Sequence, residues 1–216
     1  AANKQAAAPA TAGTTTHRGT IDLLASATTD AERANITKQL VEAPETIAQL
    51  SDDDFKKIVE VIGSVTDTRN SVNGAYAVEQ LTRVLSVIIG KREKGQAKQL
   101  FEVLLNSYLK SAGSQENVTR NDIIAGNIDK VGQRTMNLYY VVFSVVILVP
   151  IGQRLVCVEA MAERLKVVTE KISIELLNAA LGFMYYITAA TLAQQSRFKE
   201  AVDHYSIACR YIPENP

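Results

Sequence analysis

Residues 181–213, LGFMYYITAATLAQQSRFKEAVDHYSIACRYIP, contain two apolar helical patterns joined by a short polar break. Small residues recur where two antiparallel helices would touch, since Ala189, Ala201 and Ala208 allow the helix backbones to approach closely. Larger side chains are expected to fill the grooves beside these contacts: Tyr185, Leu192, Phe198 and Tyr205. The stretch therefore predicts a helical hairpin at the carboxyl end of the sequence.

This hairpin resembles the tetratricopeptide repeat, a helix–turn–helix unit of about 34 residues. When Pro213 is placed at the late proline of that repeat, Tyr185 falls at its large aromatic position and Ala189 at its small position. Thr188 departs from the pattern, because leucine is more usual there. One such hairpin cannot bury its own apolar face, so the resemblance implies stacked neighbours upstream. An ordinary amphipathic helix pair is the alternative.

Composition and charge narrow the classes of function. Hydrophobic residues make up 47% of the sequence, enough for a substantial core. Lys+Arg and Asp+Glu balance at 23 each, so no overall field draws the chain to nucleic acid or to an anionic membrane. The cysteines, Cys157 and Cys209, lack the spacing of metal ligands, and we expect both to be buried in helices as small hydrophobic residues.

No motif in the sequence indicates catalysis. A glycine-rich phosphate loop, a zinc-binding helix and a nucleophile elbow are all missing from it. His204 is expected on the final helix beside Tyr205, and we expect it to face solvent or a neighbouring helix. We therefore predict that the chain is not an enzyme and that it uses neither a cofactor nor a metal ion.

Helical spacing recurs along almost the whole chain, which predicts an all-α fold of stacked antiparallel hairpins, an α-solenoid. Thr29 and Ser51 are expected to cap helices. The longer helices are predicted at residues 70–89, 96–111, 153–171, 172–195 and 197–212. Residues 113–127 are the most loop-like interior stretch, and we favour a connector over a binding loop there. We predict a flexible Ala/Thr-rich tail over residues 1–18, short helices over 19–66 and a helical-repeat domain over 67–216.

Residues 136–149 are almost wholly apolar, and three interpretations compete for them. The run is short for a transmembrane helix and is followed by Pro150 and Gly152. Its many β-branched residues would suit a buried strand. A central helix with neighbours on every side is favoured, because helical patterns flank the run on both sides.

From Asn70 onward, the order of the helices resembles the helical-repeat half of PCI-domain proteins. These are scaffold subunits of the proteasome lid, the signalosome, translation initiation assemblies and the nuclear mRNA-export complex. The resemblance is carried by residues 76–85, 97–109 and 136–165 and by the hairpin with Phe198, Ala201 and Tyr205. Family members continue into a winged-helix module, and the residues up to Pro216 show no counterpart of it.

Together these observations predict a non-catalytic scaffold or adaptor subunit that binds other proteins of a larger assembly. A terminal hairpin should expose apolar area, so Phe198, Tyr205 and Tyr211 are the candidate partner-binding residues. Alternatively, these side chains pack inside the hairpin against Ile187 and Leu192. Direct contact with nucleic acid is not expected, although a basic cluster could contact phosphate: Lys91, Arg92, Lys94 and Lys98.

Two further classes of function remain open. An accessory subunit of an organellar, mitochondrial membrane complex would place residues 136–151 or the tail against lipid or a membrane subunit. A self-assembling viral or filament protein would also be helical and free of motifs. If the chain is a scaffold, we expect it in the cytoplasm or the nucleus. If it is a subunit of an organellar membrane complex, we expect it in the mitochondrion.

Overall fold

The structure is a computed structural model that describes residues 17–47, 49–115 and 117–211. All regular secondary structure in these ranges is α-helical, which confirms the predicted all-α class. The predicted flexible tail lies outside the described residues, apart from residues 17 and 18, which begin the first helix. The helices are α1 (His17–Ser26), α2 (Asp30–Val41), α3 (Pro44–Ile47), α4 (Asp52–Ser64), α5 (Val72–Lys91), α6 (Lys94–Gly113), α7 (Arg120–Ile124), α8 (Ile128–Val131), α9 (Gln133–Leu148), α10 (Ile151–Leu165), α11 (Lys171–Gln194) and α12 (Phe198–Tyr211).

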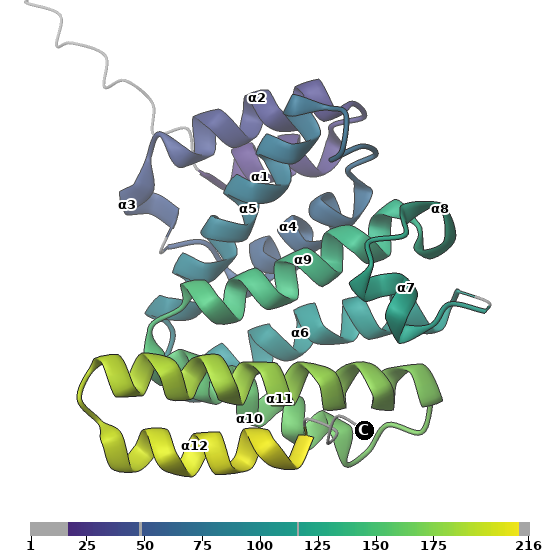
Figure 1. The fold of residues 1–216 in the computed structure, drawn as a ribbon. Coiled ribbons are helices and arrows are strands. Elements are labelled where there is room, and N and C mark those ends of the chain that lie inside the picture. The colour runs from purple at the N-terminus through teal and green to yellow at the C-terminus, as the bar shows by residue number, and fades with distance from the viewer. Residues whose placement is uncertain (1–16, 48, 116, 212–216) are drawn as a thin grey trace, which may run out of the picture.

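The helices lie in successive layers from α1 and α2 at one end to the α11–α12 pair at the other (Figure 1). Helix α9 crosses the middle of the molecule and packs against α4, α5 and α6, while α10 lies against α6 and α11. One hydrophobic core extends from Ile21 in α1 to Met184 in α11. The short helices before residue 66 therefore share their core with the longer helices that follow.

The predicted helix starts at Thr29 and Ser51 are confirmed in atomic detail. Each side-chain oxygen accepts a hydrogen bond from the third backbone amide of its helix, and the acidic side chain three residues on accepts one in return. The predicted end of α5 at residue 89 is too early, because the helix continues through Gly90 to Lys91. Gly90 serves close packing here, since a Cβ would lie only 3.2 Å from Cδ of Pro150.

The apolar run at residues 136–149 forms most of α9, so the strand interpretation is wrong. One side of the helix is buried, and it carries Leu138, Val141, Val142, Val145 and Val146. The expectation of neighbours on every side is also wrong, because Tyr140, Ile147 and Leu148 are each nearly half exposed. Helix α9 is therefore a core helix with an apolar side that the described structure covers only in part.

Arg154 in α10 joins the end of α9 to α11. Its guanidinium group donates to the carbonyl oxygens of Val146 (3.0 Å) and Ile147 (2.7 Å) and to the hydroxyl of Thr191 (2.8 Å). A positive charge suits the carboxyl end of a helix, where carbonyl groups lack partners within the helix. Burial lowers the pKa of Arg154 from its usual value. This one side chain thus fixes three helices relative to one another.

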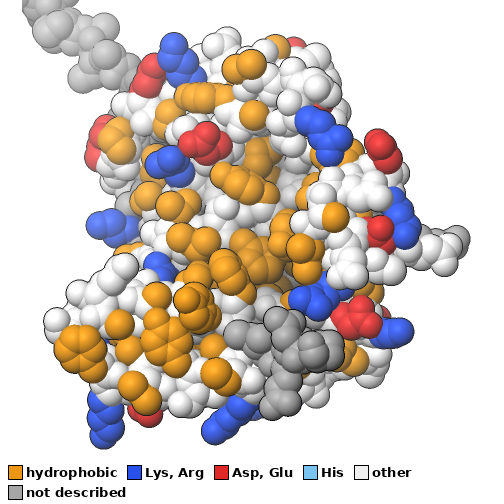
Figure 2. Space-filling model, in the orientation of Figure 1, with side chains coloured by type: hydrophobic (Ala, Val, Ile, Leu, Met, Phe, Trp, Pro, Cys, Tyr) orange, Lys and Arg blue, Asp and Glu red, His pale blue; other side chains and the backbone are white. Residues whose placement is uncertain are grey.

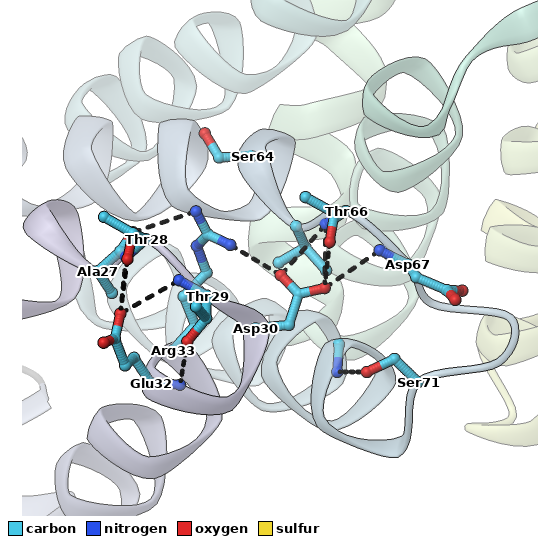
Figure 3. A network of polar contacts seen from close by, with 12 residues as sticks. Ala27, Thr28, Thr29, Asp30, Glu32, Arg33, Ser64, Thr66, Asp67 and Ser71 are labelled. Carbon is cyan, nitrogen blue, oxygen red and sulfur yellow. Dashed lines mark hydrogen bonds and ion pairs between the residues drawn. The ribbon is translucent and has the colours of Figure 1, made fainter.

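Asp30 ties the start of α2 to the segment between α4 and α5 (Figure 3). Its carboxylate accepts hydrogen bonds from the amides of Thr66 and Asp67, from the Thr66 hydroxyl at 2.7 Å and from Arg33 at 2.7 Å. Burial alone would raise the pKa of Asp30, but these hydrogen bonds together lower it below the usual value. The network holds two segments in place that are distant in sequence.

Within the described residues, α11 is the helix long and apolar enough to cross a membrane. Half of its most apolar 18-residue window is buried against the rest of the protein. Helix α9, which contains most of the membrane-contact candidate at residues 136–151, has 16 residues and does not reach that length. The other candidate, the tail, lies almost wholly outside the described residues. By length and composition, a membrane-spanning segment among the described residues would be α11.

Candidate protein-interaction surface

Helices α11 and α12 pack side by side as the predicted hairpin. Ala189, Ala201 and Ala208 are buried between the helices, as expected from their size, and Leu192 is buried with them. Ser196 takes a left-handed conformation (φ 60°), and the amide of Arg197 donates to the Leu192 carbonyl at 2.9 Å. That geometry is a standard helix-ending turn, so it returns the chain tightly along α11.

One side of this hairpin carries large apolar side chains that are exposed or half-exposed to solvent, and we call it the aromatic face. It is formed by Phe183 and Tyr186 of α11 and by Phe198, Val202 and Tyr205 of α12. The exposed fractions are 48% for Phe183, 51% for Tyr186, 65% for Phe198 and 62% for Val202. The two helices meet on this side through an edge-to-face contact of Tyr186 with Tyr205, whose ring centroids are 5.5 Å apart.

The spacing of these residues explains why they share one side. Phe198, Val202 and Tyr205 follow one another at intervals of four and three, which keeps them on one face of a helix. Phe183 and Tyr186 are three residues apart on α11. Figure 2 shows hydrophobic side chains gathered over α11 and α12 and continuing toward α9, with Lys and Arg at the outer edges. The aromatic face is therefore continuous and has a charged rim.

An apolar groove of about 260 Å³ extends this surface between α7, α9 and α11. Phe183 forms one wall together with Leu176, and Tyr139 and Phe143 of α9 form the other. The rings of Tyr139 and Phe143 on this wall pack against each other with centroids 4.6 Å apart. Arg120 of α7 lines the end of the groove. A side chain from a partner could enter this groove beside the aromatic face.

The structure brings two of the three predicted partner-binding residues together. Phe198 and Tyr205 share the aromatic face, whereas Tyr211 stacks on Tyr185 with parallel rings 6.0 Å apart, away from the Tyr186–Tyr205 contact. The expectation that Phe198 fills a groove inside the hairpin is wrong, because this first residue of α12 is largely exposed. Tyr205 is half-buried, in keeping with a position at the edge of that contact.

The predicted basic cluster is spread over the break between α5 and α6. Lys98 forms an ion pair with Glu163 of α10 at 2.6 Å, and this hydrogen bond raises the pKa of Lys98 and lowers that of Glu163. Arg92 lies 3.6 Å from the carboxylate of Asp52 and also contacts the Leu50 carbonyl. Lys91 and Lys94 are exposed. Half of the cluster thus faces acidic groups of the protein itself.

A second, polar cleft of about 650 Å³ lies between α7, α11 and α12, and we call it the arginine cleft. Its lining includes Arg120 and Asn121 of α7, Glu175 and Asn178 of α11, and Arg210 and Tyr211 of α12. Sequence reasoning missed it, because residues 113–127 were expected to be a connector and Arg210 lies 90 residues further along the chain. The capping residue Thr119, with Asp122 three positions later, was the available signal that a short helix begins there.

The two cysteines lie in opposite environments. Cys157 is buried, as predicted, and burial raises the pKa of its thiol to about 12. Cys209 is exposed, so the expectation of burial is wrong for it. It lies four residues after Tyr205 and thus on the same side of α12 as the aromatic face.

No protein-family model matches this sequence, and comparison with curated proteins and with solved structures gave no significant match. Among the described residues, no three His, Cys, Asp or Glu side chains are grouped so that they could hold a metal ion.

Proposed function

We propose that this chain is a non-catalytic scaffold or adaptor subunit that binds another protein of a larger complex through its aromatic face. The observation that carries the proposal is a contiguous set of exposed aromatic side chains on ordered helices, edged by charged residues. Contiguous exposed apolar patches are typical of interaction sites. Tyr and Phe anchors give large contact areas, and few of their torsions must be ordered on binding.

We further propose that the helix pairs act as a tetratricopeptide-like array of the kind found in PCI-domain scaffolds. The observations in support are the hairpin of α11 and α12, with its buried alanines, and the placement of α10 against both α6 and α11. In such an array the side of the last hairpin would be the surface on which the next unit or a partner stacks. The aromatic face lies on that hairpin.

The proposal is tested by affinity capture from the native cells with a double variant of the aromatic face, Phe198→Glu with Val202→Glu. Both side chains are largely exposed, so we expect the variant to fold normally. Val72→Glu with Leu23→Glu is the matched control, because it adds the same charge at positions that are 85% and 60% exposed and lie outside the hairpin, on α5 and α1. We expect a stoichiometric partner with the wild type and with the control, and its loss with the double variant.

The captured partner must then bind the purified chain directly, with the same dependence on the two substitutions. Equal binding by the wild type and the double variant would show that the aromatic face is not the contact. Sedimentation velocity of the pure chain tests the alternative that the protein assembles with copies of itself. A wild-type protein that forms large particles, and a double variant that remains monomeric, would assign the face to copies of the chain itself.

A second candidate is an accessory subunit of an organellar membrane complex, and the length and apolarity of α11 favour it. Aromatic residues are enriched where proteins meet the membrane–water interface, so the aromatic face would suit contact with lipid or with a membrane subunit. Extraction of native membranes with alkaline carbonate separates the candidates. A scaffold is released into the supernatant, whereas a chain that inserts α11 stays in the pellet.

A further inference from the structure

We propose that the arginine cleft binds an acidic peptide segment of the protein partner, with an apolar residue of that segment seated in the adjoining groove. This inference rests on the proposed scaffold function. The cleft and the apolar groove are neighbours, because Arg120 and Ala179 line both of them. A ligand that extends across Arg120 thus contacts the apolar groove on one side of this residue and the polar arginine cleft on the other.

The charges in the cleft favour a carboxylate ligand. Neither Arg120 nor Arg210 forms an ion pair with an acidic side chain of the described structure. The Nε atom of Arg120 is in addition buried without a hydrogen-bond partner in the described structure, so its own residues do not satisfy this guanidinium group fully. A planar guanidinium group matches the two oxygens of a carboxylate.

The other residues that line the arginine cleft favour a peptide over a small polyanion as its ligand. Glu175 places a negative charge in the cleft, and its carboxylate lies 3.8 Å from Lys171. That charge opposes a doubly charged phosphate group more than a single carboxylate, and it can accept a hydrogen bond from a peptide amide. Asn121 and Asn178 can both donate and accept, as an extended peptide backbone requires. The hydrophobic walls of Phe143 and Phe183 then accommodate a neighbouring apolar side chain.

The test is selection of random 12-residue peptides displayed on phage against the purified full chain. We expect the recovered peptides to be enriched in Asp and Glu close to a Leu or an aromatic residue. A synthetic peptide of the most frequent sequence is then titrated, by fluorescence anisotropy, into the wild type and into the double variant Arg120→Gln with Arg210→Gln. We expect the Kd to rise about tenfold or more in the variant, the change that 1.4 kcal/mol produces.

The matched control is Lys166→Gln with Lys199→Gln, which removes the same charge from two exposed positions outside the cleft. We expect it to retain the wild-type Kd at moderate ionic strength. Peptides without acidic enrichment, or equal affinity for the wild type and the arginine variant, would overturn the proposal. So would a selection that recovers acidic peptides with a chain truncated after Tyr211 but none with the full chain.

The failure of this inference can be told apart from failure of the proposed function. If the native partner is lost on substitution of Phe198 and Val202 but still binds the arginine variant, the aromatic face is the contact and the arginine cleft is not. If neither set of substitutions affects the partner, the scaffold proposal fails as well.

Discussion

Gly74 is a single residue on which the position of the first turn of α5 depends. A Cβ at this position would lie 1.8 Å from the carbonyl oxygen of Asp67 and 3.1 Å from a methyl group of Val65. Ser71 caps the helix with a hydrogen bond from the Gly74 amide, so the first turn of α5 is pressed against the preceding loop. Only glycine allows the chain to approach itself so closely at this turn.

We predict that Gly74→Ala lowers the free energy of unfolding by about 3 kcal/mol or more, since the backbone of residue 67 must shift to admit the methyl group. Urea denaturation measures the change. Gly95→Ala is the control, because a Cβ there meets nothing within 4 Å. We expect that control to be neutral or more stable by up to about 1 kcal/mol, as for glycine in a helix.

Asp30 provides a prediction of pH dependence. Its folded-state pKa is below the usual value, so its contribution is present above about pH 4, the unfolded pKa, and is lost as the pH falls through the lower folded value. At pH 7 we expect Asp30→Asn to destabilise the protein by about 2 kcal/mol, since an amide replaces a charged acceptor of several hydrogen bonds. The difference from the wild type should shrink as the pH falls below about 4.

The control for this series is Asp53→Asn, whose carboxylate is 83% exposed beside Lys56. Such surface pairs contribute about 1 kcal/mol or less. Denaturation midpoints of the three proteins at pH 7 and pH 3 give the comparison. A gap between the wild type and Asp30→Asn that is as large at pH 3 as at pH 7 would contradict the role assigned to the Asp30 charge.

Two threonines of helix α11, three residues apart, differ in the hydrogen bonding of their hydroxyl groups. The hydroxyl of Thr188 is buried and has no hydrogen-bond partner in the described structure. The hydroxyl of Thr191, in contrast, accepts from Arg154 and donates to the Ile187 carbonyl at 3.0 Å. Thr188 is also the residue at which the hairpin departs from the tetratricopeptide pattern.

We predict that Thr188→Val stabilises the protein by about 1 kcal/mol, because it removes an unpaired polar group and preserves the shape of the side chain. Thr191→Val should destabilise it by about 1–2 kcal/mol, since the buried Arg154 loses an acceptor. Thermal unfolding of the two variants measures both changes. Stabilisation by Thr191→Val would show that Arg154 does not depend on this hydroxyl.

The hairpin also shows how far an element can be predicted from sequence. Its small residues indicate helix–helix contact directly, because only small side chains fit where two helix backbones approach closely. These residues are Ala189, Ala201 and Ala208. Phe198 could not be placed in this way, since an aromatic residue at a helix start suits either burial or a partner surface. The exposed side of α9 could not be predicted for a related reason, because in an almost wholly apolar run the sequence does not distinguish a buried face from an exposed one.

At the scale of the whole molecule, the arginine cleft depends on contacts between distant segments. Arg120 and Arg210 share it because α7 packs onto the start of α11 and α12 returns to that end. No local pattern encodes such a meeting. The N-caps at Thr29 and Ser51, in contrast, were predictable because their partners lie three residues away.

The cysteines give a simple test of the global packing. Cys157 is buried with its pKa raised to about 12, while Cys209 is exposed beside the aromatic face. We predict that a disulfide reagent at pH 8 labels one thiol in the native chain and both after denaturation, because the thiolate is the reactive form. Mass spectrometry of the labelled peptides identifies the site. Rapid native labelling at Cys157 would contradict the buried position of α10.

The central claim is that the aromatic face contacts a protein partner, and site-specific cross-linking in the native cells tests it most directly. The photoreactive residue benzoylphenylalanine replaces Val202 on the face or Asp203, which is exposed on another side of α12. We expect one dominant cross-linked protein from position 202 after illumination and little or none of it from position 203. Equal cross-linking from both positions, or none from 202 while the chain sits in a complex, would contradict it.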